Sequence, residues 1–163
     1  MAVNTVRLVL VFLGALVLGL LVFYAWALQK PHNTVIPNPQ LPTKQVTIGN
    51  TTVVAEVADT NLTRQTGLSG RASLAQGRAM LFVFDEAGEY GFWMKDMSFS
   101  IDIIFADDSG VILNVDSNLS PLTYEQKVPQ VFYPAKPARY VLELPAGYAK
   151  KHNIAVGMKM TIH

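Results

Sequence analysis

The sequence predicts an α+β fold: a mostly antiparallel small β-sheet or barrel-like domain with two short helices, preceded by one N-terminal transmembrane helix. Three observations predict it. Residues 8–28 contain no charged side chain. From residue 45 onward, short runs rich in β-branched and aromatic residues alternate with turn signals, a pattern typical of antiparallel sheets. Only residues 59–67 and 146–153 carry the signals of short helices.

The chain divides into a short N-terminal segment (residues 1–7), an apolar segment (8–28), a proline-rich linker (29–44) and a domain (45–163). The apolar segment matches the roughly 20 residues that an α-helix needs to cross a bilayer core. Proline at the density of the linker disfavours helix and sheet, so we expect an extended tether.

The ends of the apolar segment predict where the domain is located. Arg7 and the amino terminus precede the segment, and Lys30 follows it. This slight excess of positive charge predicts a single-pass membrane protein whose domain is exported to the periplasmic or extracellular side. Ala25 and Ala27 also fit a signal-peptidase site, so secretion after cleavage near Ala27 is the alternative. The run is longer than the roughly 7 to 15 apolar residues of a cleavable signal, which favours an anchor.

The first elements of the domain follow from turn and capping signals. Residues 46–58 are predicted to form a hairpin around Gly49-Asn50, a dipeptide typical of tight turns. Asp59 or Thr60 can cap a short helix, and Gly67 can close it in the left-handed conformation.

The middle of the domain supplies its most apolar strands. Residues 79–84 are apolar on both faces, which is typical of a central strand or a barrel strand. Residues 90–94 predict the next strand. Residues 101–106 and 111–115 flank an Asp-Asp-Ser-Gly sequence and predict a second hairpin.

The last part of the domain begins with an irregular connection, because residues 121–137 contain several prolines and little periodicity. Residues 138–144 predict a strand, residues 146–153 a helix and residues 157–162 the last strand. The domain is therefore expected to contain about six to eight short strands.

Asp102 lies in the most apolar part of the chain. If residues 107–110 form the turn, strand pairing places Ala106 opposite Val111 and Asp102 opposite Val115. That face is apolar apart from Asp102, so a carboxylate there requires backbone amides or a cation. Two interpretations stay open: Asp102 anchors the fold, or it lies at the base of a cleft.

The neighbouring sequence contributes further candidates for a site. Residues 90–95 are predicted to place Trp93 and Lys95 on one face, and Gly91 indicates a bulge or a close approach of another backbone segment. A Trp beside a Lys and an Asp resembles the lining of small-ligand pockets, with a core position for Trp93 as the alternative. The candidate ligand-binding residues are Arg64, Arg71, Trp93, Lys95, Asp96 and Asp102.

Several classes of function find no support in the sequence. The chain has no cysteine, which excludes thiolate catalysis and Cys-ligated zinc. The three histidines have no metal-ligand spacing, and no glycine-rich phosphate-binding motif occurs. From Gln45 onward 10 Lys and Arg residues stand against 12 Asp and Glu residues, a charge near −2. We therefore expect no cofactor, no metal and no nucleic-acid partner.

Five motifs carry a resemblance to a known family. "RQTGLSGRASL", "AMLFVF", "FWMKDMSFSIDIIFADDSGVI", "YVLELPAG" and "VGMKM" occur in this order and resemble the domain of unknown function 192 family over residues 46–162. The resemblance implies a small, compact, β-rich domain that is exported or anchored, and it implies no settled activity. The positions that carry it are Arg64, Gly67, Leu68, Arg71, Leu74, Met80, Leu81, Phe82, Phe84, Phe92, Trp93, Met94, Lys95, Asp102, Phe105, Gly110, Leu142, Glu143, Gly147 and Gly157.

The chain departs from the family pattern at three places. Asp96-Met97 replaces the usual asparagine-threonine, "SFSI" replaces isoleucine-proline-leucine, and Ala79 replaces a glycine. Because Asp96 changes the local charge, a ligand shared with the family does not follow from the resemblance.

Three hypotheses for the function remain. The first is a membrane-anchored, non-catalytic module of the cell envelope that binds a small molecule, an envelope polymer or a protein partner. The second is a hydrolase of an envelope polymer or sugar, with Asp96 and Asp102 as acid and base and with Arg71 or Lys95 stabilising charge. The third is a purely structural envelope protein. The absence of a catalytic motif favours the first.

Overall fold

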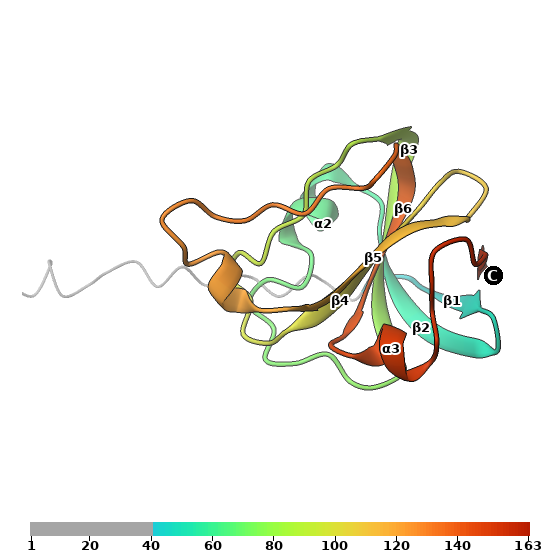
Figure 1. Cartoon of the computed structure of the whole chain (residues 1–163), viewed down its shortest axis with the longest axis horizontal. Helices are drawn as coiled ribbons and strands as arrows, with labels where there is room; N and C mark the ends of the chain where they lie inside the picture. Colours follow the sequence, from blue (N-terminus) through green and yellow to red (C-terminus); the bar gives the residue numbers. More distant parts are fainter. Residues whose placement is uncertain (1–40) are drawn as a thin grey trace, which may run out of the picture. The chain divides into compact units, whose positions relative to one another are not determined.

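The computed structural model describes residues 41–163, and the predicted transmembrane segment lies outside the described residues. No helix in this described range is long and apolar enough to span a membrane. Within residues 41–163, seven strands and three short helical segments form the fold (Figure 1). They are β1 (Thr43–Ile48), β2 (Thr51–Ala58), α2 (Asn61–Thr66), β3 (Arg78–Gly88), β4 (Ile101–Ala106), β5 (Ile112–Leu119), the 3-10 helix η1 (Pro121–Thr123), β6 (Ala138–Pro145), α3 (Tyr148–Lys151) and β7 (Met160–Ile162).

The strands form one mixed sheet in the order β5-β4-β6-β3-β2-β1-β7. Every neighbouring pair is antiparallel except β2 and β3, which are parallel. The parallel pair requires a crossover, and α2 with the loop after it supplies one. The mostly antiparallel sheet with two short α-helices confirms the predicted α+β class of the domain, and the transmembrane helix expected before it lies outside the described residues.

The two edges of the sheet approach each other just before β5 and β7. Val111 bridges Lys159, the Ile112 amide donates to the Met158 carbonyl at 2.9 Å, and the Met160 amide donates to the Gly110 carbonyl at 2.8 Å. A Cβ atom at Gly110 would collide with the Met160 carbonyl oxygen, so only glycine permits this approach. The closure gives the sheet its half-barrel curvature.

Local signals placed most elements correctly. The Gly49-Asn50 turn joins β1 to β2 with Ile48 opposite Thr51. Thr60 caps α2 through a reciprocal capping box with Thr63. The predicted turn and helix cap are confirmed. Gly67 ends the helix with a positive φ of 49°, but its ψ of −132° lies outside the left-handed helical conformation that was expected.

Two expectations about strands were wrong. Residues 90–94 form no strand; only Phe92 makes an isolated bridge, to Phe132. In the hairpin of β4 and β5, Ala106 pairs with Ile112 and not with Val111, and Val115 pairs with Ile104 and not with Asp102. Irregularities in the β4–β5 pairing, which local turn rules do not reveal, shift the register.

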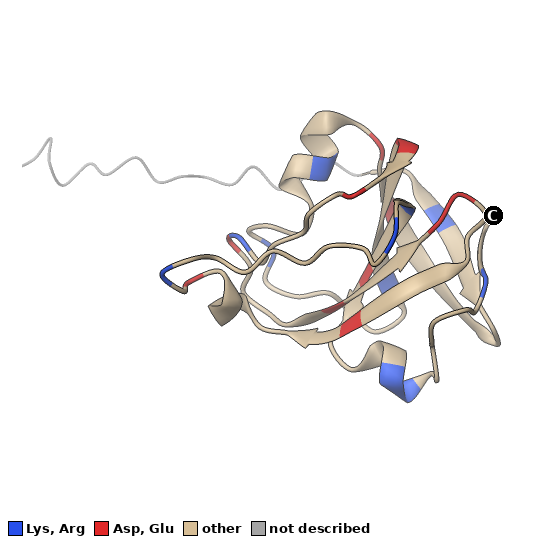
Figure 2. Ribbon diagram, turned by 45° about the horizontal axis from the view of Figure 1, so that its top comes forward, with Lys and Arg blue, Asp and Glu red and all other residues tan. Residues whose placement is uncertain are grey.

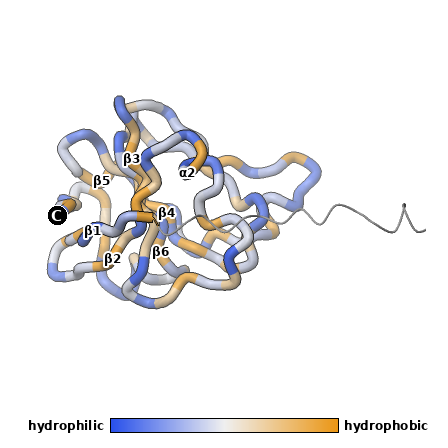
Figure 3. The backbone as a smooth tube through the Cα atoms, turned by 180° about the vertical axis from the view of Figure 1, so that it is seen from behind, coloured by the Kyte–Doolittle hydropathy of each residue, from blue (hydrophilic) through white to orange (hydrophobic). Residues whose placement is uncertain are grey.

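Both faces of the sheet are covered by apolar side chains. On β6, Leu142 and Leu144 belong to a core with Ile104 of β4, whereas Val141 belongs to a second core with Ile103. Strand side chains alternate between faces, so the two cores lie on opposite sides of the sheet. Figure 3 shows the hydrophobic stretches following the strands, with hydrophilic residues at the loop tips.

Asp102 lies on the first of these faces and anchors the fold. Its side chain is fully buried at 0% exposure. One carboxylate oxygen accepts from the Asn118 amide at 2.8 Å and from the Gly147 amide at 2.9 Å, and the other accepts from the Ala149 amide at 2.9 Å. These bonds join β4 to the end of β5 and to the first turn of α3. The backbone amides therefore satisfy the carboxylate without a cation.

We predict that Asp102→Asn lowers the free energy of unfolding by about 3 kcal/mol, because the new NH₂ group faces a backbone N–H donor that then loses its acceptor. Urea denaturation measures the change. Asp96→Asn is the matched control, since Asp96 is exposed and its φ of 55° is one that asparagine tolerates. The control should change stability by less than about 0.5 kcal/mol. Equal stabilities for the two variants would contradict the anchoring role.

Candidate functional site

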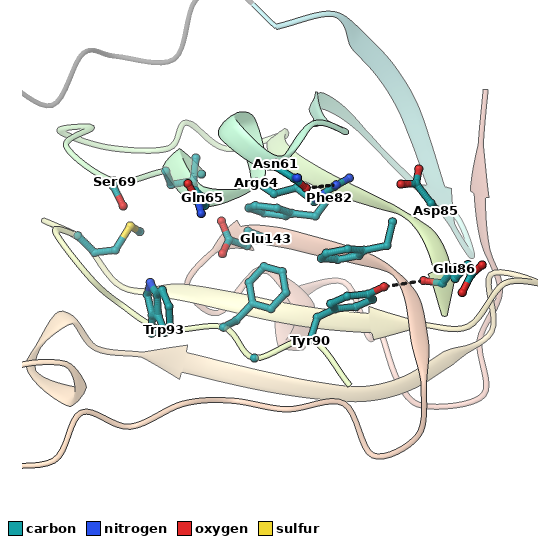
Figure 4. A pocket seen from close by; sticks show the side chains of 16 residues that line it. Asn61, Arg64, Gln65, Ser69, Phe82, Asp85, Glu86, Tyr90, Trp93 and Glu143 are labelled. Atoms are coloured by element: carbon teal, nitrogen blue, oxygen red, sulfur yellow. Dashed lines mark hydrogen bonds between the residues drawn. The ribbon is translucent and has the colours of Figure 1, made fainter. Parts of the chain in front are cut away.

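A cavity of about 740 Å³ lies over the second face of the sheet, beside α2, β3 and the loop after β3. Figure 4 shows the side chains that surround it. Its volume is within the range of small-molecule sites, which is roughly 300–1,000 Å³. The lining residues are Asn61, Arg64, Gln65, Gly67, Leu68, Ser69, Phe82, Phe84, Asp85, Glu86, Tyr90, Gly91, Phe92, Trp93, Met97 and Glu143.

Arg64 fixes α2 against the middle of β3. Its Nη1 donates to the carbonyl oxygens of Asp59 and Val83, both at 2.7 Å, and its Nη2 donates to Oδ1 of Asn61 at 2.8 Å. The guanidinium also lies 5.1 Å from the centre of the Phe84 ring. Arg64 therefore holds one side of the cavity in place, and most of its guanidinium N–H groups already donate hydrogen bonds within the protein.

Aromatic rings form one wall of the cavity. Phe84 stacks on Tyr90 with centroids 3.6 Å apart, and Phe92 meets Phe82 edge to face at 4.9 Å. The Tyr90 hydroxyl donates to the Glu86 carbonyl at 3.0 Å. Phe82 and Phe84 share this face because they are two residues apart on β3. The mutual contacts of the rings give the wall a fixed shape.

Gly91 lets the loop after β3 approach the connection between β5 and β6. A Cβ atom at this position would lie 2.7 Å from Cγ1 of Val131 and 2.8 Å from the Tyr133 ring. Phe92 and Phe132 exchange two backbone hydrogen bonds at 2.9 and 2.8 Å. The close approach predicted from Gly91 is confirmed, and it places Phe92 and Trp93 at the cavity.

Glu143 is a buried polar group that reaches the cavity from the central strand β6 (Figure 4). It lies on β6 opposite Met80 of β3 and Ile103 of β4, and it is only 5% exposed. Its Oε2 atom accepts no hydrogen bond from any residue between 41 and 163. Burial raises the pKa of this carboxyl to about 8, and the charge of Arg71 opposes the shift.

Arg71 lies near the cavity without lining it. Its two terminal nitrogens donate to the two carboxylate oxygens of Glu56, each at 2.7 Å. This hydrogen-bonded pair lowers the pKa of Glu56 and raises the pKa of Arg71. The positive charge that acts on the pKa of Glu143 is therefore already paired with the carboxylate of Glu56.

The other predicted site residues are dispersed. Arg64 and Trp93 line the cavity, and Trp93 is 52% exposed, so it is not a core residue. Lys95 and Asp96 are exposed in a turn, where their carbonyls accept from the Ser69 hydroxyl and the Gly70 amide. Asp102 lies on the opposite face of the sheet. The structure does not bring Asp96 and Asp102 together at the cavity.

Sequence reasoning missed Glu143 as a site residue. A signal was present, because Glu143 stands between Leu142 and Leu144 in a strand whose alternate positions are also apolar. When a strand is covered on both faces, a single carboxyl group on it is buried away from water and needs a hydrogen-bond partner in the protein or a ligand. Within residues 41–163 no group of three or more His, Cys, Asp or Glu side chains could hold a metal ion.

The half-barrel sheet and the cavity over its second face define a small β-rich domain with a ligand-sized cavity. The chain belongs to the domain of unknown function 192 (DUF192) family, described as "Uncharacterized ACR", whose family model matches residues 44–162. No curated protein matches the chain.

Several solved structures are similar to this domain, among them the following two. One is a crystal structure from Sinorhizobium meliloti 1021 of a candidate transcription regulator, with a TM-score of 0.70 and 25% identity, covering 77% of this chain and 97% of that one. The other is a protein of unknown function from Novosphingobium aromaticivorans DSM 12444, with a TM-score of 0.68 and 27% identity, covering 77% of this chain and 89% of that one.

The raised pKa of Glu143 predicts a specific dependence of stability on pH. A carboxyl that titrates at the ordinary value of 4.5 when unfolded and at about 8 when folded binds more protons in the folded state between these values. Its contribution to stability is complete below pH 4.5 and is lost as the pH rises toward 8. Relative to Glu143→Gln, the unfolding free energy of the wild type should fall by about 3 kcal/mol between pH 5 and pH 8. Parallel pH profiles for the two proteins in urea denaturation would contradict the burial of a titrating carboxyl.

Proposed function

We propose that the domain is a non-catalytic module that binds a small molecule in the cavity between α2, β3 and the loop after β3. The observation that carries the proposal is Glu143, a buried carboxyl whose Oε2 has no partner among the described residues and which lines an aromatic cavity. A buried polar atom without a partner is costly, and a bound ligand can supply the missing hydrogen bond.

The hydrolase hypothesis lacks the geometry that it needs. Asp102 is sealed from solvent, and three backbone amides occupy its oxygens. An acid and a base that act on one bond must both reach the substrate. We therefore favour binding over catalysis at this site.

The distribution of charged residues argues against proposing for this chain the role of transcription regulator, which is the description given to the Sinorhizobium protein. Figure 2 shows Lys and Arg residues dispersed among Asp and Glu residues over helices, strands and loops of the described domain, and the charge of residues 45–163 is near −2. Proteins that bind DNA concentrate positive charge on one face. A small-molecule ligand fits the aromatic cavity better than a nucleic acid does.

We predict that the full-length chain in detergent micelles binds at least one compound of a small-molecule library of sugars, amines, amino acids and aromatic metabolites, detected by ligand-observed NMR. Trp93→Ala should weaken that binding about tenfold, because it removes an aromatic surface of the cavity. Val156→Ala is the control, since Val156 is similarly exposed at 63% and does not line the cavity. A screen without hits, or hits that Trp93→Ala leaves unchanged, would contradict the proposal.

We further propose that residues 8–28 anchor the domain to the outer face of a membrane, as a single-pass envelope protein. The support is the charge-free apolar run followed by a proline-rich tether. The anchor would hold the binding module near envelope polymers and protein partners, which are the other ligands that such a module could meet.

The anchor predicts that the full-length chain stays in the membrane pellet after carbonate extraction. Replacing Leu16 and Leu18 together by Arg should release it, since each charge near the centre of a spanning helix costs about 3 kcal/mol. Recovery of the wild type as a soluble protein whose N-terminus lies near Leu28 would overturn the anchor and support cleavage near Ala27.

A further inference from the structure

We propose that the ligand of this cavity is a small organic ammonium ion, whose N–H group donates to Oε2 of Glu143 while its apolar part lies against the aromatic wall. This inference rests on the proposed binding function and specifies the chemical class of the ligand.

The charges around the cavity favour a cation. Among the described lining residues, Asp85, Glu86 and Glu143 carry carboxyl groups, and Arg64 carries the only positive charge. The guanidinium of Arg64 already donates hydrogen bonds to the carbonyls of Asp59 and Val83 and to the side chain of Asn61. It also contacts the Phe84 ring. An anionic ligand would therefore meet uncompensated carboxylates, whereas an ammonium ion would be attracted to them.

Glu143 lacks a cation of its own. The guanidinium of Arg71 makes both of its short bonds to Glu56, so its charge is shared with that carboxylate. Lys95 is exposed and does not line the cavity. An ammonium ion next to Oε2 supplies both the missing donor and the missing positive charge, which a neutral hydroxyl cannot do.

The aromatic side of the cavity suits the remainder of such a ligand. Cations interact favourably with the faces of Trp, Tyr and Phe rings, and Trp gives the strongest interaction. Trp93 is half exposed at the cavity, and Tyr90 and Phe92 continue the wall beside it. An amine that carries a ring or an alkyl group can contact this wall and Glu143 together.

Binding of an ammonium ion is coupled to the ionisation of Glu143. The free protein holds the proton because burial raises the pKa of this carboxyl to about 8. The ammonium ion keeps its own proton and favours the carboxylate, so the Glu143 proton leaves to solvent on binding. Affinity should rise about tenfold per pH unit between pH 6 and pH 7 and level off above pH 8. A neutral ligand that accepts the Glu143 proton in a hydrogen bond would bind more weakly as the pH rises through 8.

Other charged groups face the same region and need a control. They are Asp85 and Glu86 on β3, Arg64 on α2, and the pair of Arg71 with Glu56. Glu143→Gln retains all of them and removes only the buried titrating group. Any pH dependence that survives in this variant belongs to those groups and not to Glu143.

The test uses the full-length chain in detergent micelles and three probes that share one ring: phenethylamine, phenethyl alcohol and phenylacetate. Isothermal titration calorimetry at pH 6, 7 and 8 measures their affinities. We expect the amine to bind, with the pH dependence given above and with proton release, and the other two probes to bind at least about tenfold more weakly at pH 8. Glu143→Gln should weaken amine binding by at least about tenfold at pH 8 and abolish its pH dependence. Glu125→Gln is the matched control, since Glu125 is exposed and does not line the cavity, and it should change amine binding less than about threefold.

Each outcome has a definite meaning. Preference for the alcohol or for phenylacetate, with loss of binding in Trp93→Ala, would overturn the ammonium class and leave the binding function standing. Amine binding that is unchanged in Glu143→Gln, or independent of pH, would also overturn the inference. If none of the three probes binds, the inference fails, and the library screen then decides whether the binding function fails with it. A thermal unfolding profile of each variant at pH 5, where the carboxyl is protonated, verifies that the substitution preserves the fold.

Discussion

The three backbone amides that donate to Asp102 are the constraint on which the rest of this structure depends. They tie β4 to the end of β5 and to the first turn of α3, and α3 directly follows β6. Fixing Asp102 toward one face also fixes the pairing of β4 with β6, in which Asp102 lies opposite Leu144 and Ile103 opposite Glu143. Because side chains alternate along a strand, the register that buries Asp102 on one face turns Glu143 toward the other.

Two buried carboxyl groups in adjacent strands therefore have opposite environments. The Asp102 carboxylate accepts hydrogen bonds from three backbone amides and is inaccessible to a ligand. In contrast, Oε2 of Glu143 accepts no hydrogen bond from any residue between 41 and 163. Desolvation without compensating donors raises the pKa of Glu143 to about 8, so the neutral form avoids most of the cost of burial. The first carboxyl stabilises the fold, and the second is available for recognition.

The sequence predicts those features that depend on a few neighbouring residues. The Gly49-Asn50 turn, the Thr60 cap and the hairpin before Val111 follow from local backbone preferences, and all occur in the structure. The register of β4 and β5 was missed because irregularities in the pairing shift it, and these depend on both strands at once. Glu143 was missed for a related reason: its isolation follows only when segments distant in the sequence, α2 and the loop around Trp93, cover the face on which it lies.

The cavity is lined by residues of a central strand and by residues of a loop, and the two supply different kinds of contact to a ligand. Glu143 is on a central strand that is hydrogen-bonded to β3 and β4, so its position is fixed by the sheet. Trp93 is on a loop that is joined to the neighbouring connection by the two bonds between Phe92 and Phe132. Sites on strands are more precise than sites on loops. The buried carboxyl can therefore define the charge and position of the polar group of a ligand, while the loop supplies the half-exposed Trp93 ring for its apolar part. A departure from the family pattern at Asp96, which lies in the same loop and is exposed, can alter the loop without disturbing Glu143.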